Sequence, residues 1–271
     1  MVTGANSGIG RVVAFQLARA QATVIMICRD QARGEEARAE AIRVSGNTRV
    51  ELMLCDLSSQ KQIRSLASDY LARHGQLHVL VNNAAVVPRE KTLTEDGIEA
   101  QLAVNHLAPF LLTNLFLEVI KRSAPSRVVS VGSGMYRTAS LDFADLQGEK
   151  RYAAMRQYSL TKLLNIHFTY ELAKRLEGTG VTVNCLGPGF TATNLGRDFS
   201  PFSRLVMRVM GKRAEKGAET VTYLASSPEV ETISGKYFEN RKIIKTSPAT
   251  CDAAISRRLW EISAKLTGGG F

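Results

Sequence analysis

Short apolar runs alternate with helix-like stretches along most of this chain, and no other feature of the sequence constrains its fold more. Six runs are typical of buried strands, at residues 1–3, 23–28, 50–55, 78–81, 127–131 and 181–185. Between them, apolar residues recur at three- and four-residue spacing, as on one face of a helix. This alternation predicts a single α/β domain, residues 1–271, built on a doubly wound parallel sheet. Because the first run is so short, we expect the first strand to be truncated at the N-terminus.

Composition supports one sizeable globular domain, with 271 residues of which 45% are hydrophobic and 22% charged. The net charge of +10 is compatible with phosphate-rich partners, but the basic residues are scattered. They form no stripe interleaved with aromatic residues, so no nucleic-acid partner is expected. The longest apolar stretch, near residues 107–120, is interrupted by Pro109, Asn114 and Glu118. No membrane span is therefore expected either.

Cysteine and histidine spacing predicts no metal site. The four cysteines do not pair at metal or redox spacing, and three of them end apolar runs. This pattern is typical of buried, reduced thiols and predicts a cytoplasmic protein. His74 and His78 have ligand-like spacing, but Gly75 between them indicates a loop.

A glycine-rich turn at residues 3–10 connects the first strand to the first helix, in which Ile9, Val13 and Leu17 are in register. Glycines let the backbone approach a pyrophosphate closely, and a helix N-terminus attracts its charge. The strand–turn–helix context favours dinucleotide binding. An ordinary glycine turn is the alternative.

Tyr158 and Lys162 lie four residues apart and so share one face of a predicted helix. A phenol has a pKa near ~10, which is too high for easy proton exchange at neutral pH. A neighbouring cation stabilises the phenolate and is expected to lower that pKa, so the pair could act as a general acid or base. The alternative is an ordinary amphipathic helix face.

Taken together, these motifs resemble the short-chain dehydrogenase/reductase family, whose members have a Rossmann fold. The matching features extend over nearly the whole chain: the turn 3–10, Asp56, 82–84 (NNA), Asn105, Ser133, Tyr158 with Lys162, Pro188 and Gly189 followed by Thr193. The run 145–149 (DLQGE) before Tyr152, and the region 227–238, are similar to the retinol-dehydrogenase-like branch.

The resemblance implies hydride transfer between a nicotinamide and a carbonyl or alcohol carbon. Tyr158 would transfer the proton, Ser133 would hydrogen-bond the substrate oxygen, and Lys162 would hold the nicotinamide ribose. Asn105 would hold a water that links Lys162 to solvent. The family pattern also implies a cofactor-binding set: Gly4, Asn6, Ser7, Gly8, Ile9, Arg29, Asp56, Leu57, Asn83, Ala84, Tyr158, Lys162, Pro188, Gly189, Thr191 and Thr193.

The end of the second strand favours NADP(H) over NAD(H). An acidic side chain there would bind the free ribose hydroxyl of NAD, but the position holds Cys28. Arg29 comes next, and its guanidinium suits a 2′-phosphate. Asp30 is expected to cap the following helix, although a shift of one residue would bring it to the ribose. Asp56 would bind the adenine amino group or, alternatively, cap the helix after it.

Residues 194–211 are the least regular part of the chain and are rich in apolar side chains. They could form a substrate lid, which would favour an apolar retinoid-, steroid- or lipid-like aldehyde or ketone, or a variable surface helix. A homodimer with contacts around Leu107 and Phe168 is expected from the resemblance. A non-catalytic dinucleotide sensor or scaffold on the same fold is the rival function.

Overall fold

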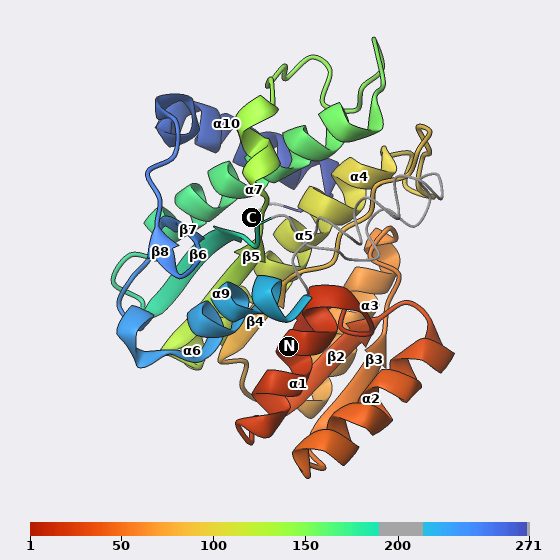
Figure 1. Ribbon diagram of the computed structural model, residues 1–271. Coiled ribbons are helices and arrows are strands. Elements are labelled where there is room, and N and C mark those ends of the chain that lie inside the picture. Colours follow the sequence, from red (N-terminus) through yellow and green to blue (C-terminus); the bar gives the residue numbers. More distant parts are fainter. Residues whose placement is uncertain (190–213, 270–271) are drawn as a thin grey trace.

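The computed structural model describes residues 1–189 and 214–269 and shows one eight-stranded sheet with helices on both faces (Figure 1). The strand order is β3-β2-β1-β4-β5-β6-β7-β8, and every pair is parallel except β7 with β8. The predicted doubly wound parallel sheet is confirmed. The strands are β1 (Val2–Thr3), β2 (Val24–Cys28), β3 (Val50–Leu54), β4 (Val79–Asn82), β5 (Ser126–Val131), β6 (Val181–Gly187), β7 (Lys236–Glu239) and β8 (Lys242–Ile243).

Helices cover the two faces of the sheet in separate layers. One face carries α1 (Gly8–Arg19), α2 (Gln31–Ser45) and α9 (Ala214–Ser226), and α1 contacts both of the others. The other face carries α3 (Gln60–Arg73), α5 (Ala108–Leu115) and α7 (Ala154–Arg175), and α10 (Ala253–Leu266) packs against α7. The shorter helices are α4 (Ala100–Leu102) and α6 (Leu117–Arg122).

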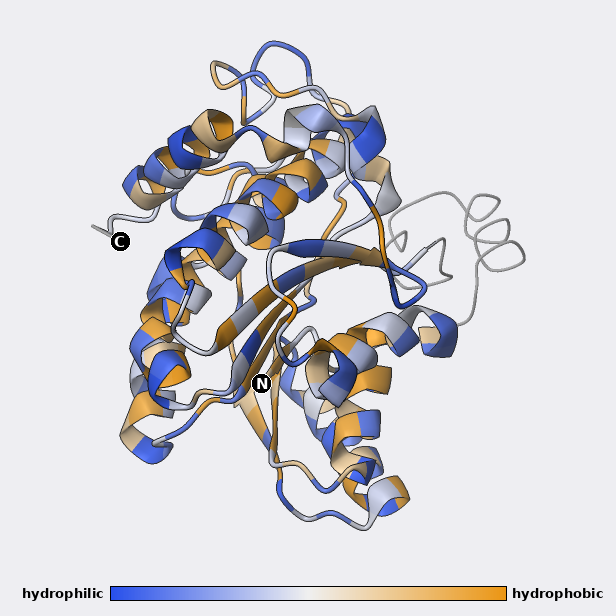
Figure 2. Cartoon of the chain, turned by 90° about the vertical axis from the view of Figure 1, so that its left-hand side faces the viewer, coloured by the Kyte–Doolittle hydropathy of each residue, from blue (hydrophilic) through white to orange (hydrophobic). Residues whose placement is uncertain are grey.

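The hydrophobic core forms two main clusters, one between the sheet and each helical layer. Figure 2 shows the hydrophobic strands running between helices whose exposed faces are hydrophilic. Strands covered on both sides need apolar residues at successive positions, and all five residues of β2 are buried. This is why the apolar runs were visible in the sequence.

Residues 95–121 do not form a single regular helix. Helix begins only at Ala100, passes through a π-helical turn (Ala103–Leu107), and continues as α5 and α6. Pro109 follows the π-helical turn directly, and Asn105 O, the carbonyl four residues before it, accepts a hydrogen bond from Asn165 Nδ2 at 2.9 Å in place of the missing N–H. Strands β7 and β8 were not anticipated.

The homodimer expected around Leu107 and Phe168 stays a prediction, and these two side chains are not themselves at the surface. Leu107 and Phe168 are each only 2% exposed and belong to the core of one chain. Trp260 of α10 stacks on Phe168 with ring centres 5.9 Å apart, so α10 covers that face of α7. Within residues 1–189 and 214–269, no helix is both long enough and apolar enough to cross a bilayer.

Candidate active site

The turns that follow β1 to β6 bring the predicted site residues to the carboxyl edge of the sheet. Parallel strands end at the same edge, where α/β proteins of this type bind ligands. Ser133 follows β5, Pro188 follows β6, and Asn83 follows β4. Tyr158 and Lys162 come to the same edge from α7, which contacts β6 and the 3-10 turn Gly134–Thr138.

The glycine turn packs tightly against the loop after β4. Gly4 has a φ of 64°, and a Cβ there would lie 3.1 Å from Ala84 Cα. A Cβ on Gly10 would lie 2.4 Å from both Asn83 Nδ2 and the Gly4 carbonyl oxygen. Two of the glycines are therefore required for the turn and the loop to meet. The sequence had suggested glycines only for approach to a phosphate.

Asn83 and Ala84 are held at this junction by Thr3. Thr3 Oγ1 accepts hydrogen bonds from Asn83 N (2.9 Å) and Ala84 N (3.0 Å). Asn83 Nδ2 in turn donates to Thr3 O at 2.8 Å. These bonds hold the loop after β4 beside the N-terminus of α1. Asn83 and Ala84, which are both proposed to bind the cofactor, are fixed there.

The N-terminus of α1 has the properties of an anion site. Ser7 precedes the helix, but its side chain makes no capping bond to it, and the first turn contains no acidic residue. Gly8 begins the helix with a φ of 54°, and Asn6 and Ser7 are partly exposed beside it. Free N–H groups at a helix start bind phosphate well. Ile9 is buried and anchors the turn to the core.

Tyr158 is 8% exposed and lies next to Ser133. Burial raises the pKa of Tyr158 to about 12, and a hydrogen bond with Ser133 offsets part of that rise. Ser133 caps the 3-10 turn after β5, where its Oγ accepts from Met135 N at 3.2 Å. The nearby Ser130 is buried inside β5.

Lys162 is 2% exposed and lies beside Tyr158, with Nζ 5.4 Å from the centre of the tyrosine ring. Nζ donates a 2.8 Å hydrogen bond to Val131 O at the end of β5. Burial lowers the pKa of Lys162 to about 8. The expected lowering of the Tyr158 pKa by Lys162 is not found: desolvation of the phenol raises that pKa, and the only offset comes from Ser133.

Asn105 lies in the π-helical turn and is 1% exposed. Its Oδ1 accepts from Val86 N at 2.8 Å, and its Nδ2 donates to Val86 O at 3.0 Å and Thr161 Oγ1 at 3.3 Å. The side chain therefore joins the loop after β4 to α7, next to Lys162. The water-holding role inferred from the resemblance stays a prediction.

The adenosine end of the site lies beyond β2 and β3. Asp30 caps α2 by accepting from Arg33 N at 3.0 Å, as predicted. Arg29 is 71% exposed, with NH1 3.8 Å from Asp56 Oδ2. Asp56 binds Ser58 N at 2.9 Å and does not cap the next helix, because Ser59 caps α3. The helix-capping alternative for Asp56 is wrong; its Oδ1 also accepts from Ser58 Oγ at 2.7 Å, and Leu57 beside it is partly buried.

Several predicted residues could not be compared with the structure. Thr191, Thr193 and the lid 194–211 lie outside the described residues. Pro188 and Gly189 directly follow β6, where Gly189 has a φ of 78°.

Two residues with roles at this site were missed in the sequence. Arg33 is partly buried on α2, and its charge acts on the thiol of Cys28 at the end of β2. Its position in the first turn of the helix that follows Arg29 was the available signal. Glu99 is fully buried and contacts both catalytic elements, but its sequence neighbours gave no indication of burial.

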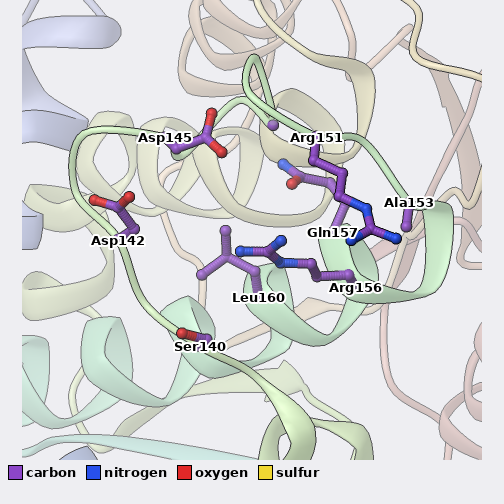
Figure 3. Close-up of a pocket in the computed structure, with 9 residues that line it drawn as sticks. Ser140, Asp142, Asp145, Arg151, Ala153, Arg156, Gln157 and Leu160 are labelled. Carbon is purple, nitrogen blue, oxygen red and sulfur yellow. The ribbon is translucent and has the colours of Figure 1, made fainter.

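A small hollow beside the start of α7 is shown in Figure 3. Asp142, Asp145, Arg151 and Arg156 give it a charged lining. Its volume of about 10 Å³ is that of a single water, so it is too small for an organic substrate. We do not assign the substrate site to this hollow.

The residues present fit a nicotinamide dinucleotide. The open N-terminus of α1 suits a pyrophosphate, and Arg29 suits an anionic ribose substituent. Lys162 has three N–H donors, and the described residues use only one of them. The donor set at this edge of the sheet therefore matches the phosphates and hydroxyls of such a cofactor.

Comparisons with known proteins agree with this geometry. A family model for short chain dehydrogenases matches residues 1–203. Human retinol dehydrogenase 14 is 44% identical over 287 residues, which cover 99% of this chain and 85% of that protein. Human retinol dehydrogenase 12 is 43% identical over 271 residues, with the same coverage.

Solved structures show the same architecture. An uncharacterized protein from Mycobacterium paratuberculosis superposes with a TM-score of 0.80 at 33% identity, covering 99% of this chain and 92% of that one. A short chain dehydrogenase from Burkholderia cenocepacia, solved in complex with NADP, gives a TM-score of 0.70 at 26% identity. That match covers 88% of this chain and 93% of the other.

Proposed function

Since the chain belongs to the short-chain dehydrogenase family and is an oxidoreductase that acts on CH–OH groups with a nicotinamide cofactor, we propose a narrower activity for it. It reduces apolar aldehydes or ketones with NADPH and runs the reverse oxidation with NADP. The observation that carries this proposal is the cluster of Ser133, Tyr158 and Lys162 at the carboxyl end of β5.

In the reaction, side chains of the protein transfer a proton and stabilise charge. A bound nicotinamide supplies or accepts the hydride. Tyr158 keeps its proton at neutral pH, because burial raises its pKa to about 12, so it can donate that proton to the substrate oxygen. Ser133 holds the same oxygen by a hydrogen bond as negative charge develops there. Lys162 supplies a positive charge below the tyrosine ring.

The proposed preference for an apolar substrate is based on the exposed side chains beside Ser133 and Tyr158. Met135 lies two residues after Ser133 and is 36% exposed, and Met155 lies one turn before Tyr158 and is 42% exposed. Large apolar side chains are exposed at only a few described positions, and two of them flank the proposed catalytic residues. The relatives named above act, by their names, on retinol. We infer a retinoid-, steroid- or lipid-like carbonyl or alcohol.

The preference for NADP(H) rests on the end of β2. Cys28 occupies the position where a carboxylate would favour NAD. Arg29 is exposed there, and Arg33 lies one turn further on α2. Asp30 caps α2, where its carboxylate is directed at the backbone N–H of Arg33 and does not take the place of the ribose-binding carboxylate. Two guanidinium groups at this point favour the phosphorylated ribose.

A cytoplasmic location and a homodimer also remain proposals. All four cysteines are free thiols, which is compatible with a reducing compartment. Cell fractionation of the tagged chain tests the location, and light scattering at micromolar concentration tests the dimer.

A substrate panel tests the proposed activity. Purified protein is mixed with NADPH or NADH and with matched pairs of bulky apolar and small polar carbonyls, and loss of the reduced nicotinamide absorbance is followed. We expect the highest kcat/KM for an apolar carbonyl with NADPH. If small polar aldehydes are better substrates, or if no carbonyl is reduced while the cofactor binds, the proposed activity is refuted and the sensor alternative gains support.

A further inference from the structure

Glu99 is a buried carboxylate outside the set of catalytic residues, and it has 0% exposure. It precedes α4, where its Oε1 accepts from Gln101 N at 2.9 Å and its Oε2 accepts from Leu102 N at 2.8 Å. Oε2 also accepts from Gln157 Nε2 at 2.9 Å. A buried charge is costly unless it is well hydrogen-bonded, and three donors meet that requirement.

The three donors to the Glu99 carboxylate belong to two elements, α4 and α7. Helix α4 leads directly into the π-helical turn that holds Asn105. Gln157 immediately precedes Tyr158 on α7. One carboxylate thus connects the start of the Asn105 segment to the start of the Tyr158 helix, although the residues are separated by 58 positions along the chain.

The segment that carries Glu99 is itself fixed on the cofactor side. Leu93 and Glu99 form an antiparallel bridge around the turn at Gly97, which has a φ of 72°. Asp96 Oδ2 accepts from Gln60 N at 3.0 Å, and Glu95 accepts a hydrogen bond from Ser59. The turn is therefore anchored to the N-terminus of α3, close to Asp56.

Gln157 and Gln147 extend the connection to the loop before α7. Gln157 Nε2 also donates to Leu146 O at 2.8 Å, and Glu99 N donates to Gln147 Oε1 at 3.0 Å. This loop includes the run 145–149 that resembles the retinol-dehydrogenase-like branch. Through these bonds, residues of the run 145–149 help to enclose the Glu99 carboxylate.

We propose that Glu99 is a positioning residue for the reaction, which holds Tyr158, through Gln157, in register with the Asn105 segment. This inference rests on the proposed function, because it assigns Glu99 an effect on the Tyr158 proton transfer. The residue does not touch substrate or cofactor. Its effect is to prevent the two elements from shifting relative to each other, and small misplacements of reacting groups are costly to rate.

The first test is Glu99→Gln, which keeps the size of the side chain and removes the charge. An amide has one acceptor oxygen, so its NH₂ group would face another N–H donor at Leu102 or Gln157. We expect kcat to fall about 10- to 100-fold while KM for the cofactor changes by less than about threefold. The pH dependence of kcat should also shift, because the surroundings of Tyr158 change.

Glu171→Gln is the matched control. Glu171 is also a buried glutamate and lies on α7, but it pairs with Arg175 at 2.8 Å, far along the helix from Tyr158. We expect this variant to lower the melting temperature and to leave kcat and its pH profile unchanged. If Glu99→Gln behaves in the same way, Glu99 is only a structural residue and the proposal is wrong.

A second variant covers the case in which Glu99→Gln does not fold. Gln157→Met removes the bond from Glu99 to α7 but leaves the carboxylate capping α4. We expect it to lower kcat by a similar factor. The kcat of the double variant should be no lower than that of the less active single variant. Additive losses in kcat, or wild-type kcat in Gln157→Met, would overturn the proposal.

The same assays include Tyr158→Phe, which separates this inference from the function on which it rests. If Tyr158→Phe retains turnover, the proposed function itself fails. If Tyr158→Phe is inactive while Glu99→Gln and Gln157→Met are normal, only the role of Glu99 is refuted.

Discussion

The ammonium of Lys162 lies 5.4 Å from the centre of the Tyr158 ring and donates its 2.8 Å hydrogen bond to Val131 O. Both residues are buried, and burial moves their pKa values in opposite directions, up for the phenol and down for the ammonium. In the protein alone, the two groups are therefore both protonated near neutral pH. Tyr158 is ready to act as an acid, and Lys162 is the group that titrates first as the pH rises.

Activity should therefore fall on the alkaline side because of Lys162. Its pKa is lowered to about 8, so the ammonium is charged below that pH and neutral above it. We expect kcat/KM for the cofactor to decrease above about pH 8, measured between pH 6 and 10. In Lys162→Arg, whose guanidinium stays charged, the decrease should disappear even if activity is lower. A wild-type profile that is flat to pH 10 would contradict this assignment.

Cofactor choice should depend on Arg29. A charge-assisted contact of ~1.5–3 kcal/mol corresponds to roughly ten- to hundredfold discrimination. We expect Arg29→Ala to reduce the ratio of kcat/KM for NADPH over NADH by that factor, mainly through KM for NADPH. Arg43→Ala, at an exposed position in the last turn of α2, is the control and should leave the ratio unchanged. Equal use of both cofactors by the wild type would show that Arg29 does not recognise the 2′-phosphate.

Stability should fall in mild acid because of two buried histidines. His106 and His167 have pKa values lowered to about 4 by burial, against an ordinary value of 6.5. Below pH 6.5 the unfolded chain takes up these protons while the folded protein does not, so stability is lost from about pH 6.5 down to about pH 4. The full effect is roughly 3 kcal/mol for each histidine.

Urea unfolding at several pH values measures this loss. His167→Gln should flatten the decrease between pH 6.5 and 4.5, since one of the two titrating groups is removed. An unchanged slope in the variant would show that other groups cause the acid sensitivity.

The glycine turn should tolerate no side chain at Gly10. A Cβ there would lie 2.4 Å from the backbone oxygen of Gly4, which cannot move without disturbing the turn. We expect Gly10→Ala to cost about 1–3 kcal/mol of stability and to weaken cofactor binding. Gly75→Ala is the control, because nothing lies within 4 Å of its Cβ, and it should be neutral or stabilising by about 0.4–1 kcal/mol. Equal melting temperatures in the two variants would contradict the packing argument.

The fold could be predicted where local sequence decides the structure. The apolar runs of β2 and β6 are buried on both faces, so their pattern alone identifies them. β7 could not be recognised in this way, because its four residues begin with Lys236 and end with Glu239. It forms by pairing with β6, and the sequence does not display that tertiary contact.

The residues of the candidate site divide in the same way, into those that local sequence identifies and those that depend on tertiary contacts. Tyr158, Lys162 and Ser133 carry chemistry in their own side chains and stand in recognisable motifs. Glu99 lies in an acidic turn that resembles a solvated loop, and its burial depends on contacts 48 and 58 positions away. The helix-capping alternative for Asp56 failed because Ser59, nearer the helix, already supplies that bond.

The role of Tyr158 can be tested by comparing single-turnover rates of the wild type, Tyr158→Phe and the control Tyr170→Phe. Tyr170 lies further along α7, where its hydroxyl bonds Thr246 at 2.8 Å. We predict that Tyr158→Phe loses carbonyl reduction while keeping its fold and cofactor affinity, since only the proton donor is removed, and that Tyr170→Phe reacts at the wild-type rate. Near-normal turnover by Tyr158→Phe on any accepted substrate would contradict the account.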